Sequence, residues 1–158
     1  MASRSLDDLT PSMRELTVKF LAGCEQAGID ALIYCTMRSF AEQNALYAQG
    51  RTTPGHIVTN AKAGQSSHNP DTFGKARAFD AVPLLHGKPQ WNDAKTYLRM
   101  GEIAESVGLK WAGRWTGRAT PVEVSLCAQA MASTDGSDVG TGALPASALM
   151  TIGSPTNG

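Results

Sequence analysis

The chain has 158 residues, of which 42% are hydrophobic and 18% are charged. This length and composition are typical of one globular domain with a core of its own. Lys plus Arg and Asp plus Glu both number 14, so the formal net charge is zero. A neutral chain argues against nonspecific binding of nucleic acid, which needs a basic surface. Three cysteines without a CxxC pair argue against a disulfide framework or a cysteine-based zinc site, and Cys24 and Cys35 are expected as buried thiols.

The N-terminal residues 1–8 contain no apolar core of a signal peptide. No segment approaches the run of about 18 apolar residues that a membrane-spanning helix needs. We therefore expect synthesis in the cytoplasm without a signal peptide, and no stable insertion into a membrane.

The first half of the chain predicts helix, strand and helix in that order. Thr10-Pro11 gives a hydroxyl N-cap with proline at the first helical position, and apolar residues at helical spacing continue to a stop at Gly28. Residues 31–36 read as a short buried strand. Ser39, with a glutamate three residues later, forms a capping box that opens a helix over 39–49.

The second half predicts shorter elements around a hairpin. The sequence indicates a loop over 51–66, a strand over 77–85, a turn over 86–88, a helix over 97–107, a strand over 109–112 and a last strand over 122–124. Because strands and helices interleave irregularly, we predict a small single α+β domain, with a short, mainly antiparallel sheet packed by helices.

The composition changes near residue 125. From there to residue 158 the chain has no Lys, Arg, His or aromatic residue, and Ala, Ser, Thr and Gly dominate. Such a segment buries too little apolar surface to offset its ordering entropy. We predict a folded domain over 1–124 and a disordered, low-complexity tail over 125–158.

His68 and Asp80 are the candidate metal ligands. His68 lies on a polar loop, and Asp80 follows twelve residues later within an apolar strand. Imidazole nitrogen and carboxylate oxygen are ligands that zinc accepts in hydrolytic sites, where three protein ligands leave a position for water. The alternatives are a surface histidine and an aspartate with a salt-bridge or capping role.

Arg38 directly follows the first strand and is a candidate for holding a substrate carboxylate with its planar fork of donors. A structural ion pair is the alternative. Trp111 and Trp115 are expected to pack in the core, and His56 and His86 to be exposed.

Several segments resemble the VanY-type zinc peptidases, and most of all the phage endolysins that act as L-alanyl-D-glutamate endopeptidases or D-alanyl-D-alanine carboxypeptidases. These segments are TMRSFAEQNALYAQGR (36–51), IVTNAKAGQSSHN (57–69) and AFD (78–80). LKWAGRW (109–115) resembles the family's later Gly-Leu-x-Trp-Gly-Gly-x-Trp segment. The match covers about residues 10–117, with its motifs in the family's order.

The resemblance implies a VanY/Hedgehog-like fold and hydrolysis of an amide bond in the stem peptide of peptidoglycan. His68 and Asp80 would be the first two zinc ligands, while Arg38 and Ser67 would contact the substrate. The implied protein is a monomer that reaches the bacterial cell wall after release, as a phage lysis enzyme does. Endopeptidase and carboxypeptidase action both remain open.

The sequence departs from the family at the expected third ligand. Where the family has a ligand histidine after proline, this chain reads Pro121-Val122-Glu123-Val124, and no acid occupies the general-base position near Ala119. Glu123 is the candidate substitute base or ligand, and His86 a second substitute ligand.

Three alternatives follow from this departure. The chain can be a catalytically impaired descendant that binds cell-wall peptides. Its C-terminal end can be truncated, frameshifted or recombined. It can also be a structural component of a phage particle that carries a lytic domain.

Overall fold

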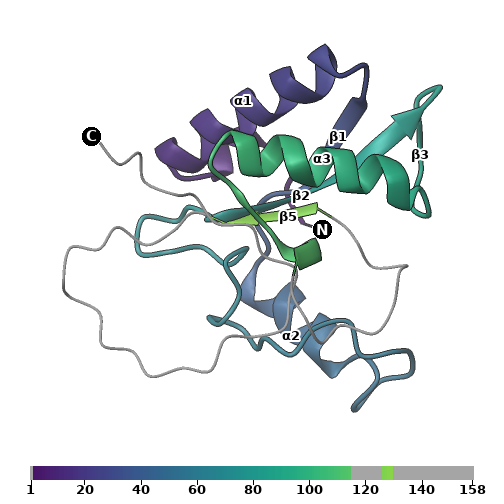
Figure 1. Ribbon diagram of the computed structural model, residues 1–158. Coiled ribbons are helices and arrows are strands. Elements are labelled where there is room, and N and C mark those ends of the chain that lie inside the picture. Colours follow the sequence, from purple (N-terminus) through teal and green to yellow (C-terminus); the bar gives the residue numbers. More distant parts are fainter. Residues whose placement is uncertain (1, 115–125, 130–158) are drawn as a thin grey trace.

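The computed structural model describes residues 2–114 and 126–129. Its elements, traced in Figure 1, are a 3-10 turn (Leu6–Asp8), α1 (Pro11–Gln26), β1 (Asp30–Cys35), α2 (Phe40–Ala48), β2 (Ala78–Leu85), β3 (Lys88–Pro89), α3 (Ala94–Ser106), β4 (Lys110–Trp111), a second 3-10 turn (Ala112–Arg114) and β5 (Leu126–Gln129).

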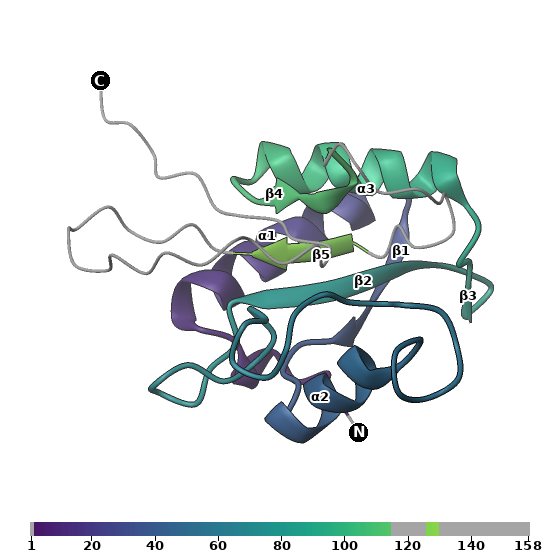
Figure 2. The same cartoon turned by 90° about the horizontal axis from the view of Figure 1, so that it is seen from below.

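One sheet organises these elements. Its strand order is β1-β2-β5-β4, β3 pairs with β2, and all of these pairings are antiparallel. Helices α1 and α3 cover one face of the sheet, and α2 with its following loop lies on the other face (Figures 1 and 2). The predicted α+β class with a mainly antiparallel sheet is confirmed.

Capping residues explain where the helices begin. The Thr10 side chain accepts a hydrogen bond from the Met13 backbone N–H, and the capping box of Ser39 with Glu42 is complete. Helix α3 begins at Ala94, three residues before its predicted start, because Asp93 caps it by accepting from the Thr96 N–H. Asp93 precedes the first apolar residue of that helix, so the apolar pattern alone placed the start too late.

The main core lies between the sheet and the two helices α1 and α3. The rings of Phe20 and Phe79 pack with centroids 5.5 Å apart and join α1 to β2. Trp111 is buried against α3, as predicted, and a Cβ atom added to Gly101 would collide with its indole ring. Trp115 lies outside the described residues. None of the helices in the described part of the chain is long and apolar enough to cross a bilayer.

Strand β5 corrects the predicted boundary between domain and tail. The predicted strand over 122–124 lies outside the described residues, whereas Leu126–Gln129 form a strand between β2 and β4. The prediction of disorder from residue 125 does not hold for these four residues. The composition of a segment indicates how much apolar surface its side chains can bury. Leu126–Gln129 form backbone hydrogen bonds along both edges of the strand, and composition does not report such pairing. Residues 130–158 lie outside the described part of the chain, so the tail over that range stays a prediction.

Candidate metal centre

Three buried side chains with metal-ligating atoms converge on the sheet face that α2 and its loop cover. Cys35 ends β1, Asp80 lies in β2 and His68 lies on the loop between α2 and β2. Each is at most 5% exposed. One ligating atom from each of the three lies within 4.8 Å of the other two. The sequence predicted His68 and Asp80 at one site, and the structure adds Cys35.

A β-bulge brings Cys35 to the same face as Asp80. In the pairing of β1 with β2, Ile33 lies opposite Ala81 and Cys35 lies opposite Asp80, so Tyr34 is an extra residue. Without this bulge, Cys35 would share the face of Ile33, which packs in the core beneath the helices. Strict alternation along β1 therefore gave no signal for Cys35 in the sequence.

The hydrogen bonds of His68 define which ring nitrogen faces the site. Its Nδ1 atom lies 2.8 Å from the carbonyl oxygen of Thr36. Because a carbonyl oxygen only accepts, Nδ1 carries the proton of this hydrogen bond, and Nε2 is the ring nitrogen that faces Asp80. Nε2 lies 3.5 Å from Oδ1 of Asp80. The alternative of a surface histidine is wrong, since His68 is 2% exposed.

This geometry fits a zinc ion. Ligands about 2.0–2.1 Å from one tetrahedral zinc lie about 3.4 Å from each other. The observed 3.5 Å between Nε2 and Oδ1 is close to that separation. Metal-bound histidines commonly donate their second ring N–H to a carbonyl oxygen, as His68 does to Thr36. The donor set and its outer hydrogen bond therefore suit the metal that the sequence predicted.

Arg38 lies beside the candidate ligands and compensates the buried carboxylate. Its Nη1 donates to Oε1 of Gln43 at 2.9 Å, and its Nη2 lies 3.4 Å from Oδ2 of Asp80. The same Nη2 lies 3.5 Å from Sγ of Cys35. The ion pair that the sequence left open as an alternative for Arg38 and Asp80 is present. It lowers the cost of burying the Asp80 charge in the absence of a metal.

Backbone hydrogen bonds hold the His68 loop against the end of β1. The Arg38 N–H donates to the His68 carbonyl at 2.8 Å, and the Arg77 N–H donates to the Ser67 carbonyl at 2.8 Å. Asn69 donates from Nδ2 to the Arg38 carbonyl at 2.8 Å and accepts from the Gly64 N–H at 2.9 Å. Ser67 is buried beside His68. The loop is therefore fixed by its main chain together with the Asn69 side chain.

The other predicted site residues do not join this cluster in the described structure. His86 occupies the exposed turn after β2, with a φ of 51°. It follows Asp80 by six residues, which along a strand is about 20 Å. That span is beyond the reach of an imidazole ring, so His86 is not a substitute ligand. His56 is exposed, as predicted, and Glu123 lies outside the described residues.

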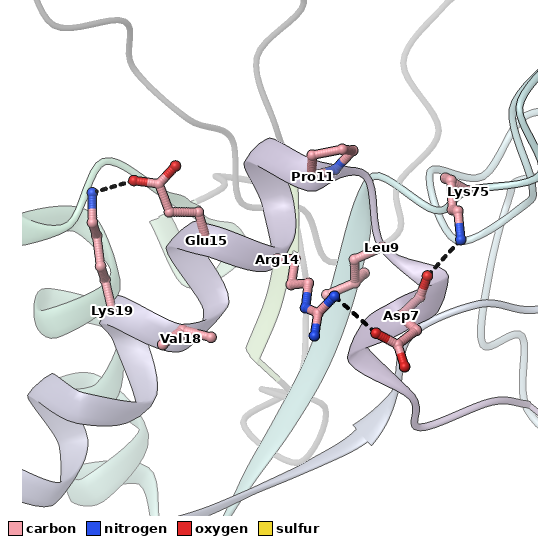
Figure 3. A pocket seen from close by; sticks show the side chains of 8 residues that line it. All are labelled: Asp7, Leu9, Pro11, Arg14, Glu15, Val18, Lys19 and Lys75. Carbon is pink, nitrogen blue, oxygen red and sulfur yellow. Dashed lines mark hydrogen bonds and ion pairs between the residues drawn. The ribbon is translucent and has the colours of Figure 1, made fainter.

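A separate hollow lies on the outer side of α1 and involves none of the candidate ligands. Its lining includes Leu9, Pro11 and Val18, with charged groups around them (Figure 3). Arg14 pairs with Asp7 at 2.8 Å and Lys19 with Glu15 at 2.7 Å. These charges balance one another, so the hollow offers no cluster of catalytic or ligating groups.

No protein-family model matches the sequence. The peptidoglycan L-alanyl-D-glutamate endopeptidase CwlK of Bacillus subtilis (strain 168) is 37% identical over 116 residues, which cover 68% of this chain and 67% of that protein. The crystal structure of the L-Ala D-Glu endopeptidase ChiX of Serratia marcescens matches with a TM-score of 0.53 at 14% identity, and covers 82% of this chain and 87% of that chain. At that identity, the likeness to ChiX shows the fold alone. The similarity to CwlK shows the family: this chain belongs to the VanY-like zinc peptidases of the L-alanyl-D-glutamate endopeptidase group.

Proposed function

We propose that this chain is a zinc-dependent peptidase that hydrolyses an amide bond in the stem peptide of bacterial peptidoglycan. The observation that carries the proposal is the approach of His68 Nε2 to Asp80 Oδ1 at 3.5 Å, with Nδ1 occupied by the Thr36 carbonyl. This arrangement brings an imidazole nitrogen and a carboxylate oxygen close together, and both are donor types that zinc accepts. Membership of the family supports the choice of zinc and of a peptide substrate.

His68 and Asp80 are the proposed metal ligands. When bound, zinc supplies a water of lowered pKa and polarises the carbonyl group of the scissile bond. The Thr36 carbonyl holds the imidazole in the tautomer that ligation requires.

Arg38 and Ser67 are the proposed substrate contacts. The Arg38 side chain is 13% exposed and lies 3.4 Å from Asp80. A metal that takes up the Asp80 charge weakens the hold of that carboxylate on the guanidinium, which then becomes available for a substrate carboxylate. Stem peptides carry free carboxylates, so a fixed guanidinium next to the metal orients the bond to be cleaved. Ser67 lies beside His68 on the same buried loop.

Glu123 is the proposed general base on the sequence alone. A carboxylate that takes a proton from the attacking water and passes it to the leaving amine is the usual partner of such a metal. Glu123 follows Pro121 and Val122, where the family places its final histidine motif. Its replacement by glutamine tests the assignment, because the amide keeps the shape and loses the basic oxygen.

The bond that we propose is the one between L-alanine and D-glutamate, because the relative CwlK is named for that cleavage. We expect the protein to be a monomer that acts on the cell wall after release from the cytoplasm, as a phage lysis enzyme does. A carboxypeptidase would remove only the terminal residue of the stem. Mass analysis of the released fragments separates the two activities, since only the endopeptidase frees a peptide that begins with D-glutamate.

The deciding experiment measures lysis of purified cell walls by the wild-type chain, with and without a chelator, and by His68→Ala. We expect both treatments to abolish lysis, and zinc to restore it to the chelated wild type. His86→Ala is the matched control, because His86 is exposed in a turn far from the site. Lysis that survives both chelation and His68→Ala would contradict the zinc mechanism. Binding to wall fragments without any cleavage would instead support the impaired descendant that the missing histidine suggests.

A further inference from the structure

We propose that Cys35 supplies a third protein ligand to the metal, as a thiolate. This inference rests on the proposed zinc site and names a residue of the chain that completes it. A catalytic zinc normally takes three protein ligands, and sulfur from cysteine is among the donors that it accepts. The candidate cluster contains a cysteine as its third member.

The backbone places Cys35 where a ligand is needed. The bulge at Tyr34 sets Cys35 directly opposite Asp80 in the sheet, so both side chains rise from the same face. Both side chains are buried there, together with the ring of His68. Bulges re-aim side chains next to active sites, and this one takes Cys35 out of the core pattern of β1.

The distances are close to those of a complete ligand set. A zinc–sulfur bond of about 2.3 Å and a zinc–nitrogen bond of about 2.0–2.1 Å hold sulfur and nitrogen about 3.6 Å apart. In the structure, one donor atom from each of Cys35, His68 and Asp80 lies within 4.8 Å of the other two. The three donor groups therefore lie close enough together to be drawn around one ion.

A cationic side chain lies beside the Cys35 sulfur. Arg38 Nη2 lies 3.5 Å from the sulfur, and a dipositive ion would be its second cationic neighbour. On binding, the sulfur–metal bond forms as the S–H bond breaks, and the proton leaves to solvent. The ion with one carboxylate, one thiolate and one neutral imidazole has no net charge, which suits a buried site.

Cys35 and His68 could also be read as a thiol nucleophile with its histidine base, but the hydrogen bonding of His68 argues against that role. The sulfur lies 3.6 Å from Nδ1, which is the distance at which a base would take its proton. Nδ1 already donates its own proton to the Thr36 carbonyl at 2.8 Å and has no lone pair to offer. The ligand role uses Nε2 and leaves this hydrogen bond intact.

Cobalt(II) substitution of the full chain tests the inference, because a cobalt–thiolate bond gives an intense charge-transfer absorption that oxygen and nitrogen ligands do not give. We expect the band in wild type, in Cys24→Ala and in Cys127→Ala, and its loss in Cys35→Ser. We also expect zinc affinity in Cys35→Ser to fall by more than the roughly 10- to 100-fold typical of outer-shell changes. Cys127 is the informative control because its backbone also pairs with Asp80, from β5.

Mass mapping of alkylated cysteines supplies a second measurement that needs no variant. Zinc should protect Cys35 of the unmodified chain from iodoacetamide, and a chelator should remove that protection. Equal labelling with and without zinc would overturn the inference, as would a band that disappears in Cys127→Ala and persists in Cys35→Ser. Zinc-dependent wall cleavage without a cobalt–thiolate band would overturn the Cys35 ligand alone, whereas a chain that binds neither metal would overturn the proposed zinc site as well.

Discussion

The Nδ1 atom of His68 and the carbonyl oxygen of Thr36 lie 2.8 Å apart, and this hydrogen bond links the loop that carries the histidine to the end of β1. Two residues further along, the Arg38 N–H donates back to the His68 carbonyl at 2.8 Å. The residue is therefore held by its ring and by its main chain against one short segment. Its Nε2 atom faces Asp80 before any metal arrives, so little side-chain entropy is lost on binding.

Replacement of Asp80 by asparagine should remove most of the zinc affinity. The amide keeps the size of the carboxylate but removes its charge, which is a ligand's main contribution to holding a dipositive ion. We expect a loss of at least about 100-fold, greater than that of most outer-shell changes, together with loss of wall cleavage. Zinc content after dialysis against a buffered zinc solution measures the effect. Asp30→Asn, at the exposed start of β1, is the control and should bind zinc as the wild type does.

Asn69 should position the metal site without touching the metal. Its amide bridges the Arg38 carbonyl and the Gly64 N–H, and the residue is buried. Asn69→Ala leaves these backbone groups without that partner, so we expect a loss of about 1–3 kcal/mol in the free energy of unfolding. Zinc affinity should fall about 10- to 100-fold as the loop loosens.

Denaturant unfolding and zinc titration of the same samples measure both effects of Asn69→Ala. Asn60→Ala is the matched control, because the Asn60 side chain is exposed and accepts from Arg51 at the surface. A stability loss without any change in zinc affinity would contradict the positioning role and leave Asn69 as a purely structural residue.

Gly101 should be irreplaceable in α3 despite the usual benefit of alanine in a helix. A Cβ atom at this position would overlap the indole of Trp111. Glycine to alanine gains about 1 kcal/mol in an unobstructed helix, whereas overpacking a core typically costs about 1–3 kcal/mol. Gly101→Ala should therefore lower the free energy of unfolding, as measured in urea. Glu102→Ala, on the exposed side of the same turn, should change it little, and a stabilised Gly101→Ala would refute the tight packing.

The sequence was sufficient to predict the local structure because short-range signals determine it. The N-cap at Thr10, the capping box at Ser39 and the apolar run around Asp80 each depend on neighbouring residues, and each prediction is confirmed. The convergence of His68 with Asp80 was also predictable, although the family resemblance rather than the spacing carried that prediction. A ligand pair on two different elements has no local signature of its own.

Two features needed the structure because they depend on pairing between distant segments. The place of Cys35 in the site follows from a bulge, and a bulge is defined only by the register of β1 against β2. The strand at Leu126–Gln129 likewise depends on the edges of β2 and β4 rather than on its own composition. A sequence pattern reports which side chains can be buried, and neither feature can be read from that pattern.

Tyr97 should make the fold sensitive to alkaline pH. Burial, with smaller contributions from the negative charges of Asp80 and Asp93, raises the pKa of Tyr97 to about 12. The unfolded chain has a tyrosine pKa of about 10, so it releases this proton first as the pH rises. The contribution of protonated Tyr97 to the free energy of unfolding is complete below pH ~10. It is lost between pH ~10 and ~12, by about 2–3 kcal/mol in total.

Tyr97→Phe removes both the titrating group and a hydroxyl that has no hydrogen-bond partner among the described residues. We therefore expect the variant to be as stable as the wild type or slightly more stable at neutral pH, and to lose less stability between pH ~10 and ~12. Burial also raises the pKa of the Cys24 thiol to about 12, so part of the alkaline loss should remain in both proteins.

Urea unfolding of the metal-free chain at several pH values measures the difference between Tyr97→Phe and the wild type. Tyr47→Phe, on the partly exposed ring beneath Arg51, should keep the wild-type pH dependence. Identical alkaline slopes for Tyr97→Phe and wild type would show that the phenol is not protected by the fold.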